Sequence, residues 1–457
     1  MTERLREVLR RTAEDVPTYP VYERALATAR RTRRRLTAAS LAAVAGLALL
    51  GTTLPAIRPA SIDPAAASEA ALPDRIGPPA LGSLHATDRP RLGPASVIFS
   101  GTHPRLRFLS LLDNADFGVV GATSDRYRLS GANVPEPVAG EGVILSPDGR
   151  WIASPGHGEG IELVDLDTGR TRALDSGVAG SVGASPLGWA PDGARLVVLA
   201  TVPVDAARSG FRDALSLVSP DGGQPVRLAV DVPSRALDIS AAFAPDGGRL
   251  AVQVGETVTI TDVDGARLAS FRLPAETALA GKGAWTADGS ALTAVSRRPG
   301  TTTWGLRRID PAAGRDQGPL PLPEVSDVTT IRLLGWRPDG AAVVVAYQPE
   351  PASGERFDAP MAMDDRTWYG NVRTVRVVAL ASGAAAPATL LTAPEQVQAI
   401  DVADAVIRGG RVRVADPPSG VGGRFWWWVG VGSLVASLVL ARRMREDHWI
   451  RRARGSR

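Results

Sequence analysis

The chain has 457 residues and no cysteine, which excludes disulfides, thiolate metal sites and cysteine nucleophiles. Its formal net charge is +4, but the positive charge is concentrated at the two ends: residues 1–35 hold ten Arg against five acids, and residues 442–457 hold seven Arg against two. The region between them is acidic, which disfavours nucleic-acid binding there.

The N-terminal tail, residues 1–35, is predicted to be cytoplasmic and helical. Thr2 is placed to cap a short amphipathic helix that ends near Thr12. Such a helix offers a docking site for a cytosolic protein within residues 1–20. The simpler interpretation is a basic segment that orients the chain and contacts anionic membrane lipids.

Two uncharged segments of 22 and 17 residues, 36–57 and 425–441, are each long enough to be transmembrane helices. Cleavage as a signal peptide near Ala65 is the alternative for the first segment, but the long preceding tail favours an uncleaved anchor. Arg residues concentrate before the first segment and after the second, in the basic tail 442–457. The positive-inside rule therefore predicts a two-span cell-membrane protein with both termini cytoplasmic and the intervening domain extracytoplasmic.

Residues 58–94 are predicted to be a Pro/Ala-rich linker, because eight prolines between positions 55 and 94 favour an extended stalk. A short linker is predicted at residues 416–424. The domain between the linkers, residues 95–415, carries the repeats.

Five turn motifs share one pattern, in which a bulky residue stands three places before an Asp-Gly pair and alternating apolar residues follow. Pro in x-Pro-Asp-Gly presets the backbone, Asp bonds backbone amides, and Gly accepts the left-handed conformation that closes a bulged hairpin. The Asp residues are 44, 54, 42 and 51 positions apart, which fits four-stranded propeller blades. The residues with this structural role are Asp148, Gly149, Asp192, Gly193, Asp246, Gly247, Asp288, Gly289, Asp339 and Gly340.

The alternation after each turn predicts a second strand with one buried face. The bulky residues are predicted to fill the wedge between neighbouring sheets; they are Leu145, Trp189, Phe243, Trp285 and Trp336. A second hairpin follows in each repeat, around Gly169, Gly222, Gly265, Gly314 and Gly383. Each repeat therefore supplies four strands.

The repeats leave partial units at both ends of the domain. Residues 117–131 match a second hairpin with no turn motif before it, and residues 397–414 offer one or two strands with no hairpin after them. The simplest inference is an all-β, six-bladed β-propeller closed by strands from both ends, which leaves no free edge at the closure. A seven-bladed ring is the main alternative, if residues 95–112 supply further strands.

The x-Pro-Asp-Gly turn after an aromatic strand end, with an Asp-x-x-x-Gly hairpin later, resembles TolB-type and WD-like propeller repeats over residues 95–414. The resemblance implies the fold and carries no catalytic residues, because these folds serve many unrelated functions. The adjacent Asp-Gly pair differs from the Ser-x-Asp-x-Gly-x-Thr-Trp box of sialidase-type propellers.

Motifs for catalysis or metal binding are weak. The four histidines are scattered, and Gly156–Gly160 lies between two predicted strands and indicates a turn. The sequences Asp165-x-Asp167-x-Gly169 and Asp262-x-Asp264-Gly265 have some likeness to calcium loops but fall where hairpin turns are expected. We therefore predict no enzyme, no metal and no cofactor.

The loops between the second and third strands vary most. The loop is longer in the second repeat, from Thr201 to Asp213, and longest in the fifth, from Gln348 to Val372. These loops lie on the rim opposite the Asp-Gly turns, and long insertions in compact repeats are often functional. The predicted ligand-binding residues of this loop are Arg356, Phe357, Asp364, Asp365, Arg366, Trp368 and Tyr369; a self-packed excursion is the alternative.

The sequence thus predicts a non-catalytic binding, sensing or scaffolding module for an unknown protein, peptide or glycan. The alternative is a transmembrane regulator, because the layout is similar to anti-sigma-like proteins that join a small inner helical region to an outer propeller. The His-x-x-x-Cys-x-x-Cys zinc motif of many such proteins is absent from this sequence. A propeller hydrolase is the third hypothesis.

Overall fold

The computed structural model describes residues 69–418, except 81, 104–105, 107–114, 135, 206–209, 231, 234–238 and 351–371, together with residues 430–433, 435–437, 439 and 442. The chain divides into two compact units, Ala67–Val429 and a second made of Met1–Ala66 with Gly430–Arg457. All the described strands belong to the first unit.

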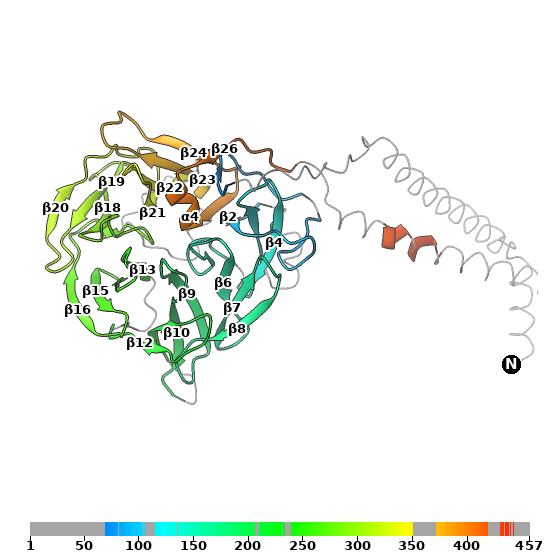
Figure 1. Ribbon diagram of the computed structural model, residues 1–457, viewed down its shortest axis with the longest axis horizontal. Helices are drawn as coiled ribbons and strands as arrows, with labels where there is room; N and C mark the ends of the chain where they lie inside the picture. The colour runs from blue at the N-terminus through cyan, green and yellow to red at the C-terminus, as the bar shows by residue number, and fades with distance from the viewer. Residues whose placement is uncertain are drawn as a thin grey trace, which may run out of the picture. The chain divides into compact units, whose positions relative to one another are not determined.

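The first unit is a ring of six four-stranded sheets (Figure 1). Five sheets are built from consecutive strands, the innermost first, and we number these blades in chain order. Blade one consists of β5 (Ile144–Leu145), β6 (Trp151–Pro155), β7 (Gly160–Asp165) and β8 (Thr171–Asp175). Blade two consists of β9 (Gly183–Trp189), β10 (Leu196–Pro203), β11 (Phe211–Val218) and β12 (Val226–Arg227). Blade three consists of β13 (Ile239–Phe243), β14 (Arg249–Val254), β15 (Thr257–Asp262) and β16 (Arg267–Arg272).

Blades four and five repeat this order. Blade four consists of β17 (Thr277–Leu279), β18 (Leu292–Arg297), β19 (Trp304–Ile309) and β20 (Asp316–Pro319). Blade five consists of β21 (Thr330–Trp336), β22 (Ala342–Pro349), β23 (Val372–Leu380) and β24 (Ala388–Thr392). The five second hairpins predicted from the sequence are thus confirmed.

The sixth, closing blade joins the two ends of the domain. Its order from the axis outward is β25 (Val397–Val402), β2 (Ala95–Gly101), β3 (Ala115–Gly121) and β4 (Tyr127–Ala132). The C-terminal strand β25 pairs antiparallel with the N-terminal strand β2. The predicted six-bladed ring closed from both ends is confirmed. The seven-bladed alternative is wrong, because the strand within residues 95–112 belongs to the closing blade and starts no further sheet.

The five Asp-Gly turns have the geometry that their residues dictate. Each Asp accepts a hydrogen bond from the backbone N–H two residues later, at 2.9 to 3.1 Å. Each Gly has a φ between +67° and +81° and donates its N–H to the carbonyl three residues earlier. A left-handed residue after a type I turn closes a three-residue hairpin. The hairpin geometry therefore accounts for the Asp and Gly residues of all five turns.

The second strand of each blade is buried on both faces. Leu250 and Val252 of β14 are fully buried, as the alternation predicts, but Ala251 between them is equally buried. The prediction of one buried face is wrong, because each blade of a closed ring packs against two neighbours.

The bulky residues fill the wedges as predicted. The indole N–H of Trp285 donates to the Ala242 carbonyl of the preceding blade at 3.0 Å. That of Trp336 donates to the Trp285 carbonyl, also of the preceding blade, at 2.8 Å.

Residues 69–94 do not form the predicted extended stalk. Leu72, Ile76 and Ala86 are buried in the same core cluster as the closing blade. The short strand β1 (Leu72–Pro73) pairs in parallel with β26 (Val412–Arg413). The prediction rested on the number of prolines and overlooked these spaced apolar residues, which pack the segment against the ring. The folded unit therefore begins well before position 95.

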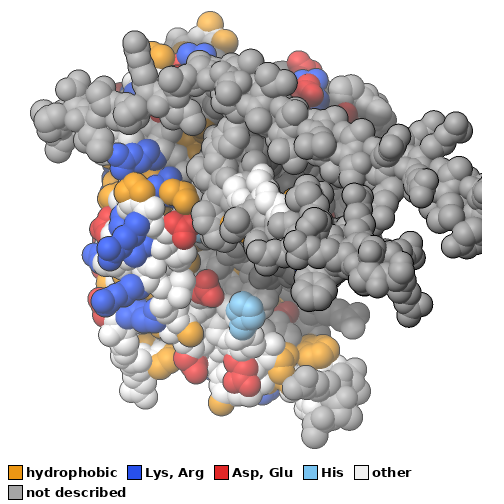
Figure 2. Space-filling model, turned by 90° about the vertical axis from the view of Figure 1, so that its right-hand side faces the viewer, with side chains coloured by type: hydrophobic (Ala, Val, Ile, Leu, Met, Phe, Trp, Pro, Cys, Tyr) orange, Lys and Arg blue, Asp and Glu red, His pale blue; other side chains and the backbone are white. Residues whose placement is uncertain are grey.

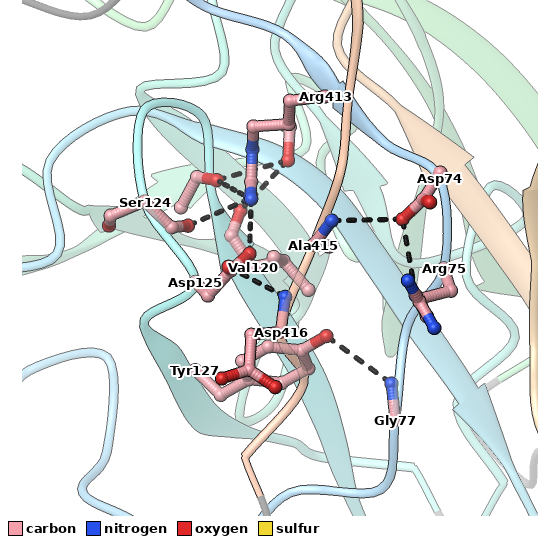
Figure 3. A network of polar contacts seen from close by, with 12 residues as sticks. Asp74, Arg75, Gly77, Val120, Ser124, Asp125, Tyr127, Arg413, Ala415 and Asp416 are labelled. Carbon is pink, nitrogen blue, oxygen red and sulfur yellow. Dashed lines mark hydrogen bonds and ion pairs between the residues drawn. The ribbon is translucent and has the colours of Figure 1, made fainter.

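Polar contacts hold the two ends of the ring together on one flank (Figure 3). The Arg413 guanidinium pairs with the Asp125 carboxylate and donates to the Ser124 carbonyl. The Ala415 N–H donates to Asp74 at 2.9 Å, and the Asp416 N–H donates to Asp125 at 2.8 Å. The chain thus enters and leaves the ring at neighbouring positions.

The loop of the second repeat is shorter than predicted. Strands β10 and β11 stay paired from Thr201↔Asp213 to Pro203↔Phe211, so that only residues 204–210 connect them. The expected long loop from Thr201 is therefore wrong.

A short helix, α4 (Asp404–Gly409), joins β25 to β26, and buries Val406 and Ile407. In the second unit, residues 430–433, 435–437, 439 and 442 are helical. Within the described part of the chain, no helix has the length and hydropathy needed to cross a membrane. The segment 36–57 and much of 425–441 lie outside the described residues, so the two spans stay predictions.

Candidate functional site

A small hollow of about 50 Å³ lies inside the ring, where the innermost strands face one another. Strands β5, β9 and β13 form an apolar wall that includes Leu145, Leu187, Trp189 and Phe243. The charged part of the lining consists of Lys282, Asp401 and Asp404. We call this hollow the axial pocket.

Lys282 is held by three oxygen atoms of the closing segment. Its ammonium nitrogen lies 2.9 Å from Asp401 Oδ1 and 2.8 Å from Asp404 Oδ1, and it donates to the Val402 carbonyl at 2.6 Å. The other oxygen of Asp401 accepts the Leu145 N–H at 3.0 Å. A compact ammonium with three hydrogens suits three separate acceptors better than a planar guanidinium does. This cluster ties blade four to the closing blade and to blade one.

Arg332 of β21 forms a second charged layer beside this cluster. Its side chain is buried, and it donates to the Tyr347 hydroxyl at 3.0 Å and to the Ile400 carbonyl at 2.5 Å. It also donates to the Gly140 carbonyl at 3.2 Å, next to Glu141. The hydrogen bonds of Arg332 thus bring together blade five, the closing blade and the loop that leads into blade one.

These surroundings determine the protonation states. Burial alone would lower the pKa of Lys282, but Asp401 and Asp404 outweigh it and raise that pKa above the usual range. Burial raises the pKa of Glu141, against the opposing effect of Arg332, and raises the pKa of Tyr347 to about 12. At neutral pH, Lys282 therefore lacks the free electron pair that a nucleophilic or Schiff-base lysine needs. The arrangement joins blade four to the closing blade.

Trp189 differs from the other wedge tryptophans. It is 9% exposed and lines the axial pocket, and its indole N–H has no acceptor among the residues that the structure describes. A buried donor without a partner costs about 1 to 3 kcal/mol. The pocket lining thus includes both this tryptophan and the partly exposed Asp404 carboxylate.

The predicted rim residues lie outside the described residues. Strand β22 ends at Pro349 and strand β23 begins at Val372, as the sequence predicts for the two flanks of this loop. Residues 351–371 contain the whole predicted set from Arg356 to Tyr369, whose role in binding stays a prediction.

The calcium-like sequences are engaged in hairpin turns. Asp165 Oδ1 accepts the N–H groups of Asp167 and Thr168, and its other oxygen accepts from Arg150 at 2.8 Å. Asp262 Oδ1 accepts the N–H of Ala266 at 2.8 Å. Within the described ranges, no three His, Cys, Asp or Glu residues lie close enough together to hold a metal ion.

Sequence reasoning missed the axial pocket, although one signal pointed to it. Lys282 is the only lysine of the sequence, in a chain that otherwise uses arginine. A single lysine in such a chain indicates a position where the guanidinium of an arginine cannot replace the ammonium group. Arg332, Asp401 and Asp404 carry no comparable signal, because their meeting depends on ring closure.

No protein-family model and no curated protein matches the sequence. The chain is similar in structure to an oligogalacturonate lyase from Vibrio parahaemolyticus, with a TM-score of 0.39, 13% identity, and coverage of 69% of this chain and 78% of that chain. It is similar to a putative TolB from Agrobacterium tumefaciens, with a TM-score of 0.36, 16% identity, and coverage of 66% and 93%.

A further similar structure is an oligogalacturonate lyase in complex with manganese, with a TM-score of 0.37, 14% identity, and coverage of 60% of this chain and 81% of that chain. At such identities no activity, ligand or metal is carried over to this chain. The six-bladed ring rests on the strand pairing of the chain itself.

Proposed function

We propose that this protein is a membrane-anchored, extracytoplasmic propeller that binds a ligand in its axial pocket without catalysing a reaction. The axial pocket carries this proposal, because its lining combines apolar side chains such as Leu187 and Phe243 with the partly exposed Asp404 carboxylate. Lys282 is neutralised by two carboxylates and stays protonated, so it orients Asp404 and does not attack a substrate. The ligand is a protein, peptide or glycan that presents a hydrogen-bond donor to Asp404.

The placement of the chain ends supports a double anchor. Both predicted spans connect to the same flank, through residues that precede β1 and follow β26. Two anchors at one flank would hold the ring in a fixed orientation to the membrane. The predicted ligand contacts of the loop between β22 and β23 stay a separate proposal, because this loop belongs to the rim opposite the Asp-Gly turns, whereas Trp189 and Pro191 of the pocket lie at one of those turns.

A photo-crosslinking residue at Leu187 tests the binding site in the intact, membrane-embedded protein. We expect capture of an envelope component, and loss of that capture in an Asp404→Asn variant. Arg298→Met, which breaks the exposed ion pair with Glu324, is the matched control and should leave capture unchanged. Equal capture by the Asp404→Asn variant would contradict the axial site.

Reporter fusions test the topology. A reporter that is active only outside the cytoplasm should work at position 300 and fail at position 457. Activity at position 457, or silence at 300, would contradict the two-span arrangement. Capture of a cytosolic protein that is lost on deletion of residues 1–20 would favour the regulator alternative.

A further inference from the structure

The outermost strands of two blades form backbone hydrogen bonds with the N-terminal segment on their outer side. The Ile76 N–H donates to the Thr392 carbonyl of β24, and the Thr392 N–H donates to Asp74, both at 3.0 Å. On β4, the Ala86 N–H donates to the Leu129 carbonyl at 2.7 Å, and the Leu129 N–H donates to Leu84 at 2.9 Å. The same N-terminal segment thus protects the edges of blade five and of the closing blade.

The neighbouring outer strand, β8 of blade one, has no such cover. Its register with β7 pairs Ile161 with Leu174 and Leu163 with Arg172, and the Asp165 N–H bonds to the Arg170 carbonyl. Because hydrogen-bonded pairs alternate in an antiparallel ladder, Thr171, Ala173 and Asp175 direct their N–H and C=O groups outward. Among the described residues, none makes a backbone hydrogen bond to this outer side of β8.

The two faces of this hairpin carry different charges. Glu162 is paired with Ala173 and lies on one face, together with Asp175. Arg172 lies on the other face, with its guanidinium 5.7 Å from the centre of the Trp151 ring. A hollow of about 490 Å³ borders the strand, and its charged lining consists of three acidic residues, Glu159, Glu162 and Asp175, and of Arg172. Glu159 and Glu162 form no ion pair with any residue that the structure describes.

We infer that the outer edge of β8 is a docking surface for an extended segment of a partner protein with basic residues at alternate positions. Such a segment would add a fifth strand to blade one, as β-strand addition does elsewhere. Its basic side chains would meet Glu159, Glu162 and Asp175, and its intervening side chains would lie toward Trp151. Figure 2 shows the side of the molecule that faces right in Figure 1, where acidic side chains lie near a histidine and basic side chains gather at the left-hand edge. This surface is separate from the axial pocket.

The free edge of blade three provides an internal comparison. Strand β16 also ends its blade, but its Ser270 pairs with Thr259 and its Arg272 with Thr257 of β15. Glu256, which precedes β15, lies 3.9 Å from the Arg272 guanidinium, so that this carboxylate already has a basic partner. Charge complementarity therefore favours β8 over β16 for a basic segment.

The test uses a fluorescent peptide of four Val-Lys repeats and the intact protein in detergent, with binding followed by anisotropy. Ala173→Pro removes one outward N–H and keeps the pairing with β7, since proline is tolerated at an edge strand. We expect it to weaken binding by about tenfold. Glu162→Gln should weaken binding by about threefold at low salt and have little effect at high salt. The control, Ser270→Pro on β16, should leave binding unchanged.

Unchanged binding by Ala173→Pro, or an equal loss in Ser270→Pro, would overturn the inference. Equal binding of a Val-Glu peptide would also overturn it, because charge would then play no part. If Ala173→Pro does not fold, hydrogen exchange at the backbone amides of the unmodified protein tests the docking site instead. Peptide must then slow exchange at Thr171, Ala173 and Asp175, and unaltered rates at these amides would contradict docking at β8.

Discussion

The Asp-Gly turns and the axial cluster both depend on carboxylates, but in opposite ways. In a turn, Asp246 accepts from an amide only two residues away, so the interaction recurs in each repeat. At the axis, Asp401 contacts Lys282 and Leu145, which lie more than a hundred positions away, and this combination occurs once. The comparison teaches that repetition in the sequence marks the framework, whereas the distinctive chemistry of the ring lies in residues that do not repeat.

The largest effect is expected from Lys282→Met. This change leaves the Asp401 carboxylate, which is 1% exposed, without its cation. Removing one partner of a buried pair costs about 3 to 5 kcal/mol, so the free energy of unfolding should fall by about 4 kcal/mol in urea denaturation. Arg298→Met, at an exposed pair, should cost less than about 1 kcal/mol. Adding Asp401→Asn to Lys282→Met should recover part of the loss; no recovery would show that burial of charge is not the cause.

The next largest effect is a difference in stability between glycine substitutions in two turns that have the same backbone conformation. Gly149 and Gly340 have φ values of +77° and +81°. A Cβ on Gly149 would lie 2.1 Å from the Ala95 carbonyl oxygen of β2, whereas one on Gly340 meets nothing within 4 Å. We expect about 3 kcal/mol of destabilisation for Gly149→Ala and about 1 kcal/mol for Gly340→Ala, measured by thermal unfolding. Equal costs would mean that the first turn takes no part in closing the ring.

Asp246→Ala should destabilise the protein by about 1 kcal/mol and leave ligand capture unchanged. The substitution removes the acceptor for the Gly248 N–H, a bond of 2.9 Å, and touches no pocket residue. Asp246→Asn keeps a side-chain oxygen and serves as the control in the same melting experiment. A stable Asp246→Ala protein that no longer captures its partner would show that this turn residue takes part in binding as well as in the fold.

The smallest effect is a pH dependence at another turn. Hydrogen bonds from Thr286 and Ser290 lower the pKa of Asp288 from 3.8 to about 2. Because the folded value is depressed, the stabilisation is present above the unfolded pKa and is lost as pH falls from 3.8 through about 2. The melting temperatures of the unmodified protein and of Asp288→Asn should therefore converge over this range. A constant difference would show that ionisation of Asp288 does not matter.

The fold was largely predictable, and the candidate site was not. The x-Pro-Asp-Gly turns predicted five hairpins, and the partial repeats around Phe117 and Val397 predicted the closing blade. The packed segment at Leu72 and Ile76 was missed because proline content suggested an open stalk. The axial pocket was missed because Arg332 and Asp401 belong to different blades. The lone lysine at position 282 was the available signal, and it became meaningful only beside its partners.

The sequence by itself determined the five repeats and the place of each hairpin, and it favoured closure from both ends into six blades. Local chemistry suffices for these features, because turn residues and alternating apolar side chains act within about ten positions. Only the tertiary structure decided that residues 69–94 fold onto the ring and that Lys282, Asp401 and Asp404 meet at its axis. Those contacts exist only after six sheets close, since closure brings together residues that no local rule connects.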